Sequence, residues 1–365
     1  MYKKHKYAIA KIIMEKKDGS VMPYSKIHRV SKQVLPLVAP EVRRILREVT
    51  DMTWQMTEEI RLREGRPLSL CGAAGEVILS PGGCPVGVDE GYRVQMDDIN
   101  LTLQLISNCS LYAFEEELRR GYLTVPGGHR VGLAGKAVLE KGEIKVLRHI
   151  SSLNFRIARE VRGIAERVLP YIVSPVVGQP CSTLIISPPQ AGKTTLLRDL
   201  VRCLSDGIPA KRVRPHKVGL VDERSEIAGS FEGSPQLDVG TRTDVLDGAP
   251  KGEGMMLLLR SMSPDIIVTD EIGREEDAAS IEEMVNAGVT VIASAHAHIL
   301  DELYYRPTIK RLLQQNVFRR IVALGRSDGP GTLEKVHDPV AFKTIYRRKL
   351  SQKSEPKTEN RAGGR

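Results

Sequence analysis

Gly192, Lys193 and Thr194 have the types and the order that bind the phosphates of a nucleotide. They lie near the end of the stretch S-P-P-Q-A-G-K-T-T at 187–195, which follows the apolar run Leu184-Ile185-Ile186 and precedes a segment of helical spacing. A strand, a tight loop and a helix that carries Gly-Lys-Thr form the phosphate-binding loop of nucleoside triphosphatases. A chance match in a surface loop would not need these flanks, so we predict ATP binding here.

Each part of this loop has a physical role. Backbone N–H groups of the loop and of the helix N-terminus favour an anion, and Gly192 lets the backbone come close because it has no Cβ. Lys193 would bridge the β- and γ-phosphates, and the Thr194 hydroxyl would ligate Mg²⁺. Ser187 stands where the pattern has its first glycine. The residues predicted to bind the nucleotide are Ser187, Pro188, Pro189, Gln190, Ala191, Gly192, Lys193, Thr194 and Thr195.

Two adjacent acids, Asp270 and Glu271, follow the apolar run 266–269. If this run is a strand beside the phosphate-binding loop, both acids lie at the carboxyl end of the sheet, where α/β proteins bind ligands. Asp270 could then hold Mg²⁺ through water, and Glu271 could polarise the attacking water as a general base. Acids at strand ends also occur as solvated turn residues, but the loop upstream favours the functional interpretation.

Further polar residues follow two other predicted strands. Asp222 and Glu223 could complete the shell of magnesium and water, with Glu223 favoured, and the alternative is an ordinary polar exit from a strand. His296 could sense the γ-phosphate through a hydrogen bond. His298 has the same composition around it but a weaker placement. A metal site made of this histidine pair is disfavoured because other ligands are missing.

The elements that must position these residues alternate between strand and helix. Continuous apolar strands separated by helices predict a parallel sheet covered on both faces, hence an α/β domain over 156–340. One helix, 161–169, would come first and end at Pro170. The expected strands after the loop are 218–221, 266–269, 289–293 and 321–324, and the expected helices are 254–262, 275–287 and 300–315.

The first part of the chain predicts a small α+β domain over 35–155. Apolar residues recur at helical spacing after Pro40, and alternation at 59–63, a turn and a second apolar stretch from Leu68 predict a β-hairpin. A helical block near Asp97, a second helix that Ser110 would cap, and two or three strands within 127–147 complete it. Residues 1–34 would form a basic variable extension, and residues 341–365 a basic disordered tail.

The net charge of +9 resides in the ends of the chain. Residues 1–32 carry a net of +7 and residues 341–365 a net of +6, which leaves about −4 for the middle. The favoured interpretation is solvated tails, and the alternative is attraction to an anionic membrane surface. A negative middle argues against a nucleic-acid translocase, which needs a positive groove.

Composition also limits the class of protein. An apolar content of 41% and a charged content of 27% are typical of a soluble globular protein, and no apolar run approaches the roughly 20 residues that span a bilayer. We expect no signal peptide from the N-terminal residues. Five cysteines without a C-x-x-C pair indicate free thiols in a reducing cytoplasm and disfavour a zinc site.

Several motifs in order carry a family resemblance. The phosphate-binding loop, V-D-E-R-S-E-I, L-L-L-R-S-M-S-P-D-I-I-V-T-D-E-I-G and T-V-I-A-S-A-H-A resemble the boxes of the traffic ATPases of type II and type IV secretion and pilus systems. E-I-R-L-R-E-G-R-P-L, G-G-H-R-V-G-L-A-G and L-V-D-E-R-S-E-I-A-G-S resemble more closely the stage III sporulation protein AA family of endospore-forming bacteria. The likeness covers roughly 35–339.

This resemblance implies a RecA-like P-loop NTPase fold and roles for particular residues. Lys193 and Thr194 match the phosphate-loop pair, Asp270 and Glu271 the Walker B acids, and His296 the histidine box. Arg260 matches a family arginine that either reaches the γ-phosphate of a neighbouring subunit or lies at the interface. The chain departs from the family pattern at Ser187 and in having Thr-Asp-Glu where many secretion ATPases have Gly-Glu.

The resemblance also implies a setting. It suggests a hexamer-forming ATPase on the cytoplasmic side, in the mother cell, acting with membrane proteins of the channel that joins mother cell and forespore. The predicted function is therefore Mg²⁺-dependent ATP hydrolysis by an oligomer. The alternatives are a nucleic-acid translocase or loader, and a scaffold that binds nucleotide without turnover.

Overall fold

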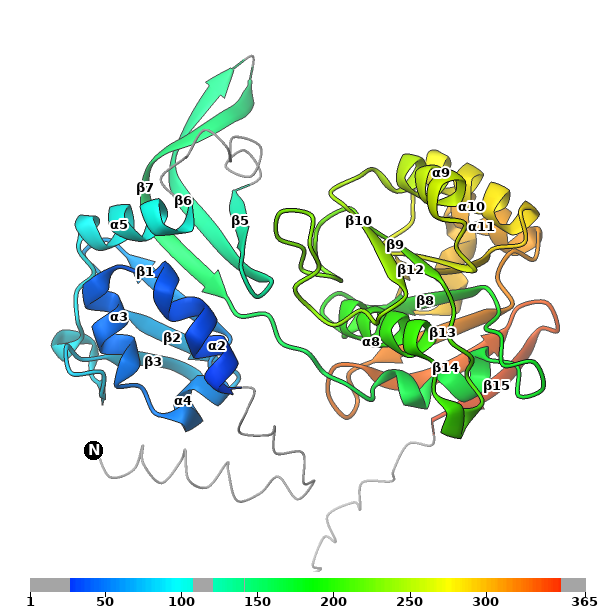
Figure 1. The fold of residues 1–365 in the computed structure, drawn as a ribbon, viewed down its shortest axis with the longest axis horizontal. Coiled ribbons are helices and arrows are strands. Elements are labelled where there is room, and N and C mark those ends of the chain that lie inside the picture. The colour runs from blue at the N-terminus through cyan, green and yellow to red at the C-terminus, as the bar shows by residue number, and fades with distance from the viewer. Residues whose placement is uncertain (1–26, 108–120, 141, 349–365) are drawn as a thin grey trace, which may run out of the picture. The chain divides into compact units, whose positions relative to one another are not determined.

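The computed structural model describes residues 27–107, 121–140 and 142–348, which fall into two compact units (Figure 1). The first unit comprises Met1–Glu160 together with Arg224–Asp238, and the second comprises Val161–Glu223 and Val239–Arg365. The chain thus leaves the second unit directly after Glu223 and returns to it at Val239.

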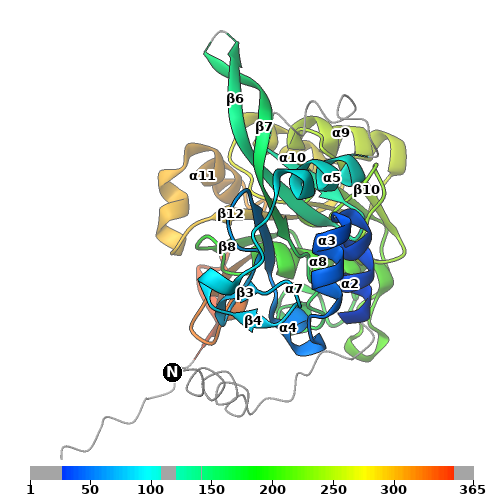
Figure 2. The same cartoon turned by 90° about the vertical axis from the view of Figure 1, so that its left-hand side faces the viewer.

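The first unit is an antiparallel sheet with helices on it, which Figure 2 shows from the side of β3 and β4. Its described strands have the order β4-β3-β2-β1-β7-β6-β5. Its helices are α2 (Ile27–Val34), η1 (Leu35–Leu37), α3 (Pro40–Arg47), α4 (Asp51–Met56), η2 (Val88–Glu90) and α5 (Met96–Ile106). Its strands are β1 (Glu59–Arg63), β2 (Ser69–Gly72), β3 (Gly75–Leu79), β4 (Pro85–Val86), β5 (Tyr122–Val125), β6 (His129–Glu140) and β7 (Glu143–Arg156).

Local patterns predicted much of this unit. Pro40 begins α3, where its fixed φ suits the first helical turn, and Val42, Ile45 and Leu46 of that helix are fully buried. The hairpin of β1 and β2 and the helix α5 are confirmed. The strands expected within 127–147 are confirmed, although β6 and β7 extend further as a long paired ribbon. The helix predicted after Ser110 lies outside the described residues.

The expected N-terminal extension needs a correction at its end. The residues up to Val34 form helix α2, and Val34 itself is fully buried in the core of the first unit. The helix has only eight residues, most of them polar or basic, so its periodicity gave a weak signal in the sequence. Residues 1–26 lie outside the described part of the chain.

The segment Arg224–Asp238 packs on the first unit although it directly follows a strand of the second. The N–H of Gly127 donates to the side-chain oxygen of Gln236 at 3.0 Å, and Arg130 pairs with Glu226 at 2.8 Å. A Cβ on Gly128 would meet the carbonyl oxygen of Gly229 at 3.1 Å, so a glycine is needed at this close approach.

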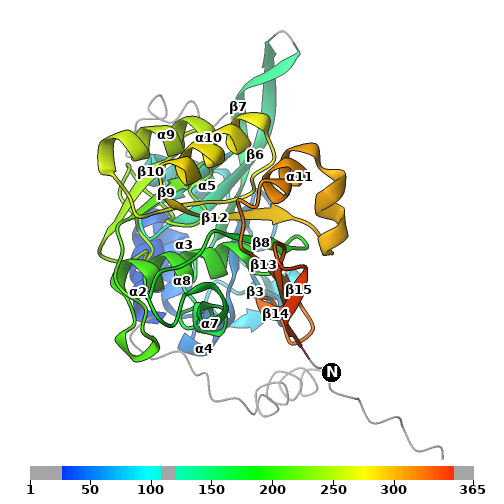
Figure 3. The ribbon, with the colours of Figure 1, turned by 90° about the vertical axis from the view of Figure 1, so that its right-hand side faces the viewer.

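The second unit is a twisted sheet with helices on both faces, best followed in Figure 3. Helix α8 covers one face of the sheet, and α9, α10 and α11 cover the other. Its helices are η4 (Ala165–Arg167), α7 (Leu169–Ile172), α8 (Lys193–Asp206), η5 (Pro209–Lys211), α9 (Lys251–Met262), α10 (Glu275–Asn286), η6 (Leu300–Tyr305) and α11 (Pro307–Gln314). Its strands are β8 (Thr183–Ser187), β9 (Val218–Asp222), β10 (Thr243–Asp247), β11 (Ile266–Thr269), β12 (Thr290–His296), β13 (Arg320–Gly325), β14 (Thr332–Asp338) and β15 (Lys343–Arg347).

The sheet order places the loop strand among its acid-bearing neighbours. The order is β10-β9-β11-β12-β8-β13-β14-β15, and all pairs from β10 to β13 are parallel. Every residue of β8 and β9 is buried, which explains their continuous apolar character. The predicted parallel α/β sheet with both faces covered is therefore confirmed.

Three expectations for this unit were wrong or incomplete. No helix spans 161–169: Gly163 takes a left-handed φ of 86°, and Pro170 lies in the first turn of the short helix α7 instead of ending a longer one. The start of the expected disordered tail forms the strand β15, which pairs antiparallel with β14. Pro307 also divides the expected helix 300–315 into η6 and α11.

Candidate nucleotide-binding site

The predicted phosphate-binding loop has the expected local structure. Strand β8 ends at the buried residue Ser187, and α8 begins at Lys193 after Gly192, whose φ is 86°. A Cβ at Gly192 would lie 2.9 Å from the backbone nitrogen of Gly331, so both the backbone conformation and the space demand glycine. The Ser187 hydroxyl donates to the carbonyl oxygen of Pro188 at 2.7 Å, which ties the serine into the start of the loop.

The connection between β13 and β14 packs against this loop, which the sequence did not indicate. Arg326 donates to the carbonyl oxygen of Pro189 at 2.7 Å, and the N–H of Gly331 donates to the carbonyl oxygen of Ala191 at 2.8 Å. Gln190 adopts a left-handed φ of 57° between these two anchors. The loop is therefore held from outside, which limits the rearrangement that nucleotide binding would need.

Lys193, Glu271 and His296 converge directly beside the loop. The Lys193 ammonium lies 2.8 Å from His296 Nδ1 and 3.6 Å from Glu271 Oε1, while His296 Nε2 lies 2.7 Å from the same carboxylate oxygen. A neutral imidazole with its proton on Nε2 satisfies both contacts, since the ammonium can only donate. The register explains the meeting, because Ser187 of β8 pairs with His296 of β12.

Burial shapes the electrostatics of this group. The Lys193 side chain is only 7% exposed, and desolvation lowers its pKa, while the neighbouring Glu271 carboxylate opposes that change. A partly desolvated ammonium gains more from a phosphate than an exposed one would, because the surrounding dielectric is lower. The buried ammonium is therefore suited to bind a phosphate in place of the carboxylate.

The backbone at Glu271 is strained. Its φ is 39°, a conformation that a residue with a side chain rarely adopts. Strand β12 holds it there: the N–H of Glu271 donates to the Ser294 hydroxyl at 3.0 Å, and the N–H of Ile272 donates to the Ser294 carbonyl oxygen at 2.8 Å. Such strain clusters at functional sites, so this geometry supports a functional role for the side chain.

A second group of charges lies at the ends of β9 and β11. Asp222 and Asp270 are buried at these strand ends, and Lys251, the first residue of α9, is buried beside them. Lys251 forms an ion pair with Glu223 and lies 3.9 Å from Asp270 Oδ1. Arg274 also approaches Glu223, at 3.8 Å. The predicted pair Glu223 and Asp270 thus meets, but around a lysine.

Sequence reasoning missed Lys251, although a signal existed. Gly252 and Gly254 follow it within a helix, where glycine is unfavourable without a packing reason. A Cβ on Gly254 would come 2.7 Å from Val221 of β9, and one on Gly252 would come 3.1 Å from the carbonyl oxygen of Glu276. The glycines let α9 lie against the sheet and α10, which brings its first residue to the acids.

The donor set fits the magnesium ion that the resemblance implies. Thr194, Asp270 and Glu223 offer a hydroxyl and two carboxylates, and oxygen ligands of this kind are the ones that Mg²⁺ prefers. Within the described residues, no group of three or more His, Cys, Asp or Glu side chains forms a metal site by itself.

Two predicted residues lie away from this cluster. Arg260 is exposed in the last turn of α9, nine residues after Lys251, which is about 13 Å along a helix axis. It therefore does not join the acids of its own chain. His298 is also exposed, and its backbone N–H donates to Glu302 at 2.8 Å.

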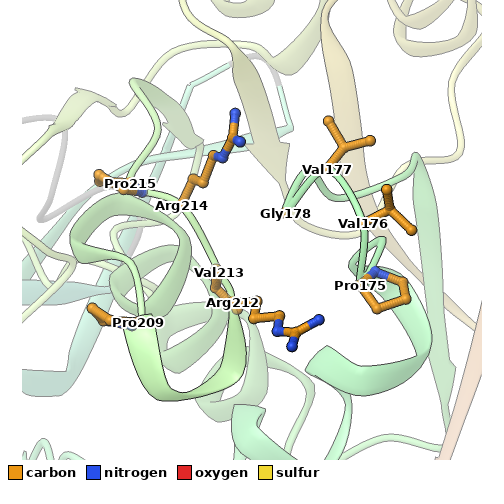
Figure 4. A pocket seen from close by; sticks show the side chains of 9 residues that line it. All are labelled: Pro175, Val176, Val177, Gly178, Pro209, Arg212, Val213, Arg214 and Pro215. Carbon is orange, nitrogen blue, oxygen red and sulfur yellow. The ribbon is translucent and has the colours of Figure 1, made fainter.

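A separate cavity of about 710 Å³ lies between the segments that precede β8 and β9 (Figure 4). Its lining residues are Pro175, Val176, Val177, Gly178, Pro209, Arg212, Val213, Arg214 and Pro215. The phosphate-binding loop follows β8, whereas the cavity lies before β8 and β9. The cavity is therefore at the amino ends of these strands, opposite the end that carries the loop. None of the predicted site residues lines it.

Among the residues that the structure describes, no helix is long and apolar enough to cross a membrane.

Comparison with known proteins agrees with the fold and the motifs. The family model described as sporulation stage III, protein AA, matches residues 28–343. Stage III sporulation protein AA of Bacillus subtilis (strain 168) is 47% identical over 302 residues, which are 82% of this chain and 93% of that protein. An uncharacterized protein, ycf45 of Cyanidium caldarium, is 33% identical over 168 residues, which are 45% of this chain and 46% of that one.

Solved structures of secretion and pilus ATPases are similar at low identity. The ATPase DotB of Legionella pneumophila is 14% identical with a TM-score of 0.48, and covers 73% of this chain and 72% of its own. The pilus retraction motor PilT with bound ADP is 12% identical with a TM-score of 0.49, and covers 73% and 74%. The parallel sheet and the loop between β8 and α8 give the second unit the P-loop NTPase fold. The family match over most of the chain confirms the resemblance seen in the motifs, and the chain belongs to the sporulation stage III protein AA family.

Proposed function

We propose that this protein is an oligomeric, Mg²⁺-dependent ATPase whose catalytic unit comprises Val161–Glu223 and Val239–Arg365. The observation that carries the proposal is the convergence of Lys193, Glu271 and His296 beside a phosphate-binding loop, with contacts of 2.7–3.6 Å. An arrangement of a lysine, a carboxylate and an imidazole at the end of such a loop suits phosphoryl transfer to water. The remaining described residues form the small α+β domain.

Each side chain has a step in this mechanism. Lys193 would exchange its contacts with His296 and Glu271 for the β- and γ-phosphates of ATP. Glu271, released from the ammonium, would accept a proton from the attacking water. His296 would remain hydrogen-bonded to that carboxylate through Nε2. To contact the γ-phosphate, its Nδ1 would have to gain a proton once Lys193 has left it, because phosphate oxygens only accept hydrogen bonds.

Thr194, Asp270 and Glu223 are the residues that would hold Mg²⁺. The ion would neutralise charge on the β- and γ-phosphate oxygens when it is bound. The side chains' own contribution is to place oxygen ligands at the ends of β9 and β11, which are joined in parallel with Thr269 opposite Val221. The parallel ladder fixes the two strand ends at the same edge of the sheet.

Assembly would complete the site. Arg260 is exposed and lies nine residues, about 13 Å along α9, from Lys251 at the acids of its own chain, so the acids that it would serve are those of another subunit. Leu257 and Met262 on the same helix are also exposed, and Arg and Met are enriched where proteins meet. An arginine supplied from a neighbour can raise the rate by about 10³–10⁵-fold. We therefore propose a homo-oligomer, a hexamer by family resemblance.

Mixing two inactive variants tests this assembly. Arg260→Ala lacks the arginine and Glu271→Gln lacks the base, so each alone should hydrolyse ATP at least about 100-fold more slowly. In a mixed oligomer, an intact Glu271 would face an intact Arg260, and activity should return to a fraction of the wild-type rate. The measurement is phosphate release after co-assembly.

Arg319→Ala is the matched control because Arg319 is exposed on the same unit, away from the loop. Arg319→Ala alone should release phosphate at the wild-type rate. When it is mixed with either inactive variant, the total activity should not exceed the activity of the Arg319→Ala subunits alone. An active Arg260→Ala protein, or a mixture with no recovery, would remove Arg260 from the site.

Membership of the family suggests a cellular setting. We propose action on the cytoplasmic side of a membrane in the mother cell, with membrane proteins of the channel to the forespore as partners. The basic residues of 1–32 and 341–365 would favour contact with an anionic membrane surface. The negative charge of the middle of the chain disfavours nucleic acid as the moved substrate.

A further inference from the structure

Lys251 is the second buried lysine at the carboxyl edge of the sheet, and the proposed reaction gives it no role. Its side chain is 9% exposed, which is rare for lysine unless the ammonium is paired. It pairs with Glu223, and it lies 3.9 Å from Asp270 Oδ1. These are two of the three side chains proposed to hold Mg²⁺.

Two buried lysines face the carboxylates at this end of the sheet, and the exposed Arg274 also approaches Glu223, at 3.8 Å. Asp222, Glu223, Asp270 and Glu271 bring four carboxylates to the ends of β9 and β11. Lys193 contacts Glu271 at 3.6 Å, whereas Lys251 serves Glu223 and Asp270. The ammonium of Lys251 therefore interacts with the same carboxylates, Glu223 and Asp270, that would bind the divalent cation.

The position of Lys251 is built into the fold. It is the first residue of α9, Gly252 and Gly254 allow that helix to lie close to α10 and β9, and the Ser280 hydroxyl donates to the carbonyl oxygen of Gly252 at 3.0 Å. The backbone under the lysine is thus anchored to α10. Helix packing therefore fixes the position of the ammonium beside the acids, whereas a surface lysine is free to change its rotamer.

We propose that Lys251 is a positioning residue that holds Glu223 at the metal edge and takes the place of the divalent cation while nucleotide is absent. The proposal rests on the proposed ATPase function. An ammonium 3.9 Å from a carboxylate and a dication bound to that carboxylate carry charges of the same sign, and their repulsion is stronger in a buried site than in water. Lys251 thereby keeps the metal out until the phosphates of ATP add negative charge.

The experiment titrates nucleotide-free protein with Mn²⁺, a paramagnetic substitute for Mg²⁺, and measures bound metal by electron paramagnetic resonance. Lys251→Met should bind Mn²⁺ at least about ten-fold more tightly than wild type, because the variant lacks the buried cation that pairs with Glu223 and lies near Asp270. Lys251→Arg keeps the charge and should resemble wild type. Lys310→Met, at an exposed position on α11, is the matched control and should also resemble wild type.

A purely structural lysine would predict a different result. Loss of a structural ion pair would lower the thermal stability of Lys251→Met and leave its Mn²⁺ affinity at the wild-type value, an outcome that overturns the proposal. If Lys251→Met does not fold, Lys251→Gln retains a hydrogen-bond donor for Glu223 without the charge, and the same titration decides the question. Adding Glu223→Gln to either variant should reverse the gain in Mn²⁺ affinity.

The two proposals fail in different ways. Wild-type protein that releases no phosphate from ATP would refute the ATPase function, whatever the Mn²⁺ titration shows. Equal Mn²⁺ affinities of wild type and Lys251→Met in an active enzyme would refute only the role of Lys251. Support for both needs an active wild type and a neutral variant that binds Mn²⁺ more tightly without nucleotide.

Discussion

Replacing Glu271 with glutamine should lower the rate of ATP hydrolysis by about 10²–10⁴-fold and leave ATP binding intact. An amide cannot accept the proton of the attacking water, but its oxygen can still accept the hydrogen bond from His296 Nε2 that spans 2.7 Å. The strained backbone at φ 39° is held by Ser294 and does not depend on the side-chain charge. Phosphate release and ATP affinity should be measured on one preparation.

Glu283→Gln is the matched control for this change, since Glu283 is exposed on α10 and the substitution removes the same charge. It should leave both readouts at wild-type values. Hydrolysis by Glu271→Gln at the wild-type rate would refute the assignment of the base.

Replacing Lys193 with alanine should weaken ATP binding by at least about 100-fold, and turnover should fall with it. The ammonium belongs to a residue of the loop and is buried, and a desolvated charge about 4 Å from a phosphate contributes several kcal/mol, where 1.4 kcal/mol is a factor of ten. Its removal also leaves Glu271 facing the incoming phosphates without the counter-charge now 3.6 Å away. Isothermal titration calorimetry with a slowly hydrolysed ATP analogue measures the loss.

Lys211→Ala gives the comparison at a surface lysine of the same unit. Lys211 pairs with Glu166 at 2.7 Å in an exposed position, and such a pair contributes only about 0–1 kcal/mol. ATP affinity should not change in this variant. Wild-type affinity in Lys193→Ala would mean that the loop between β8 and α8 does not bind the phosphates.

The sequence was sufficient where the signal was local. The residue order at 187–195 predicts the phosphate-binding loop. Apolar runs followed by acids predict the ends of β9 and β11. The parallel sheet follows from alternation, and its carboxyl edge then gathers Lys193, Glu271 and His296. The contacts of 2.7–3.6 Å needed the register of β8 against β12, which sequence patterns do not give.

The features that were not predicted depend on packing between segments that are distant in the sequence. Lys251 matters because α9 lies against β9 and α10, a contact that depends on glycines distant from the acids in sequence. Tertiary structure also decides two other features. The segment Arg224–Asp238 belongs to the first unit, and the N–H of Gly331 donates to the phosphate-binding loop. The prediction of a helix at 161–169 was wrong because it took Pro170 as the end of a helix. Proline also suits the first turn of a helix, and Pro170 lies in the first turn of α7.

The most direct test of the account is phosphate release from Mg²⁺ and ATP by wild-type protein over a range of protein concentrations, with the oligomeric state measured in parallel. An oligomeric ATPase should release many phosphates per chain, at a rate per chain that rises as oligomers form and then reaches a plateau. ATP that is bound but never hydrolysed would show a nucleotide-binding scaffold instead. Full turnover by a strictly monomeric preparation would contradict a site completed by a neighbouring subunit.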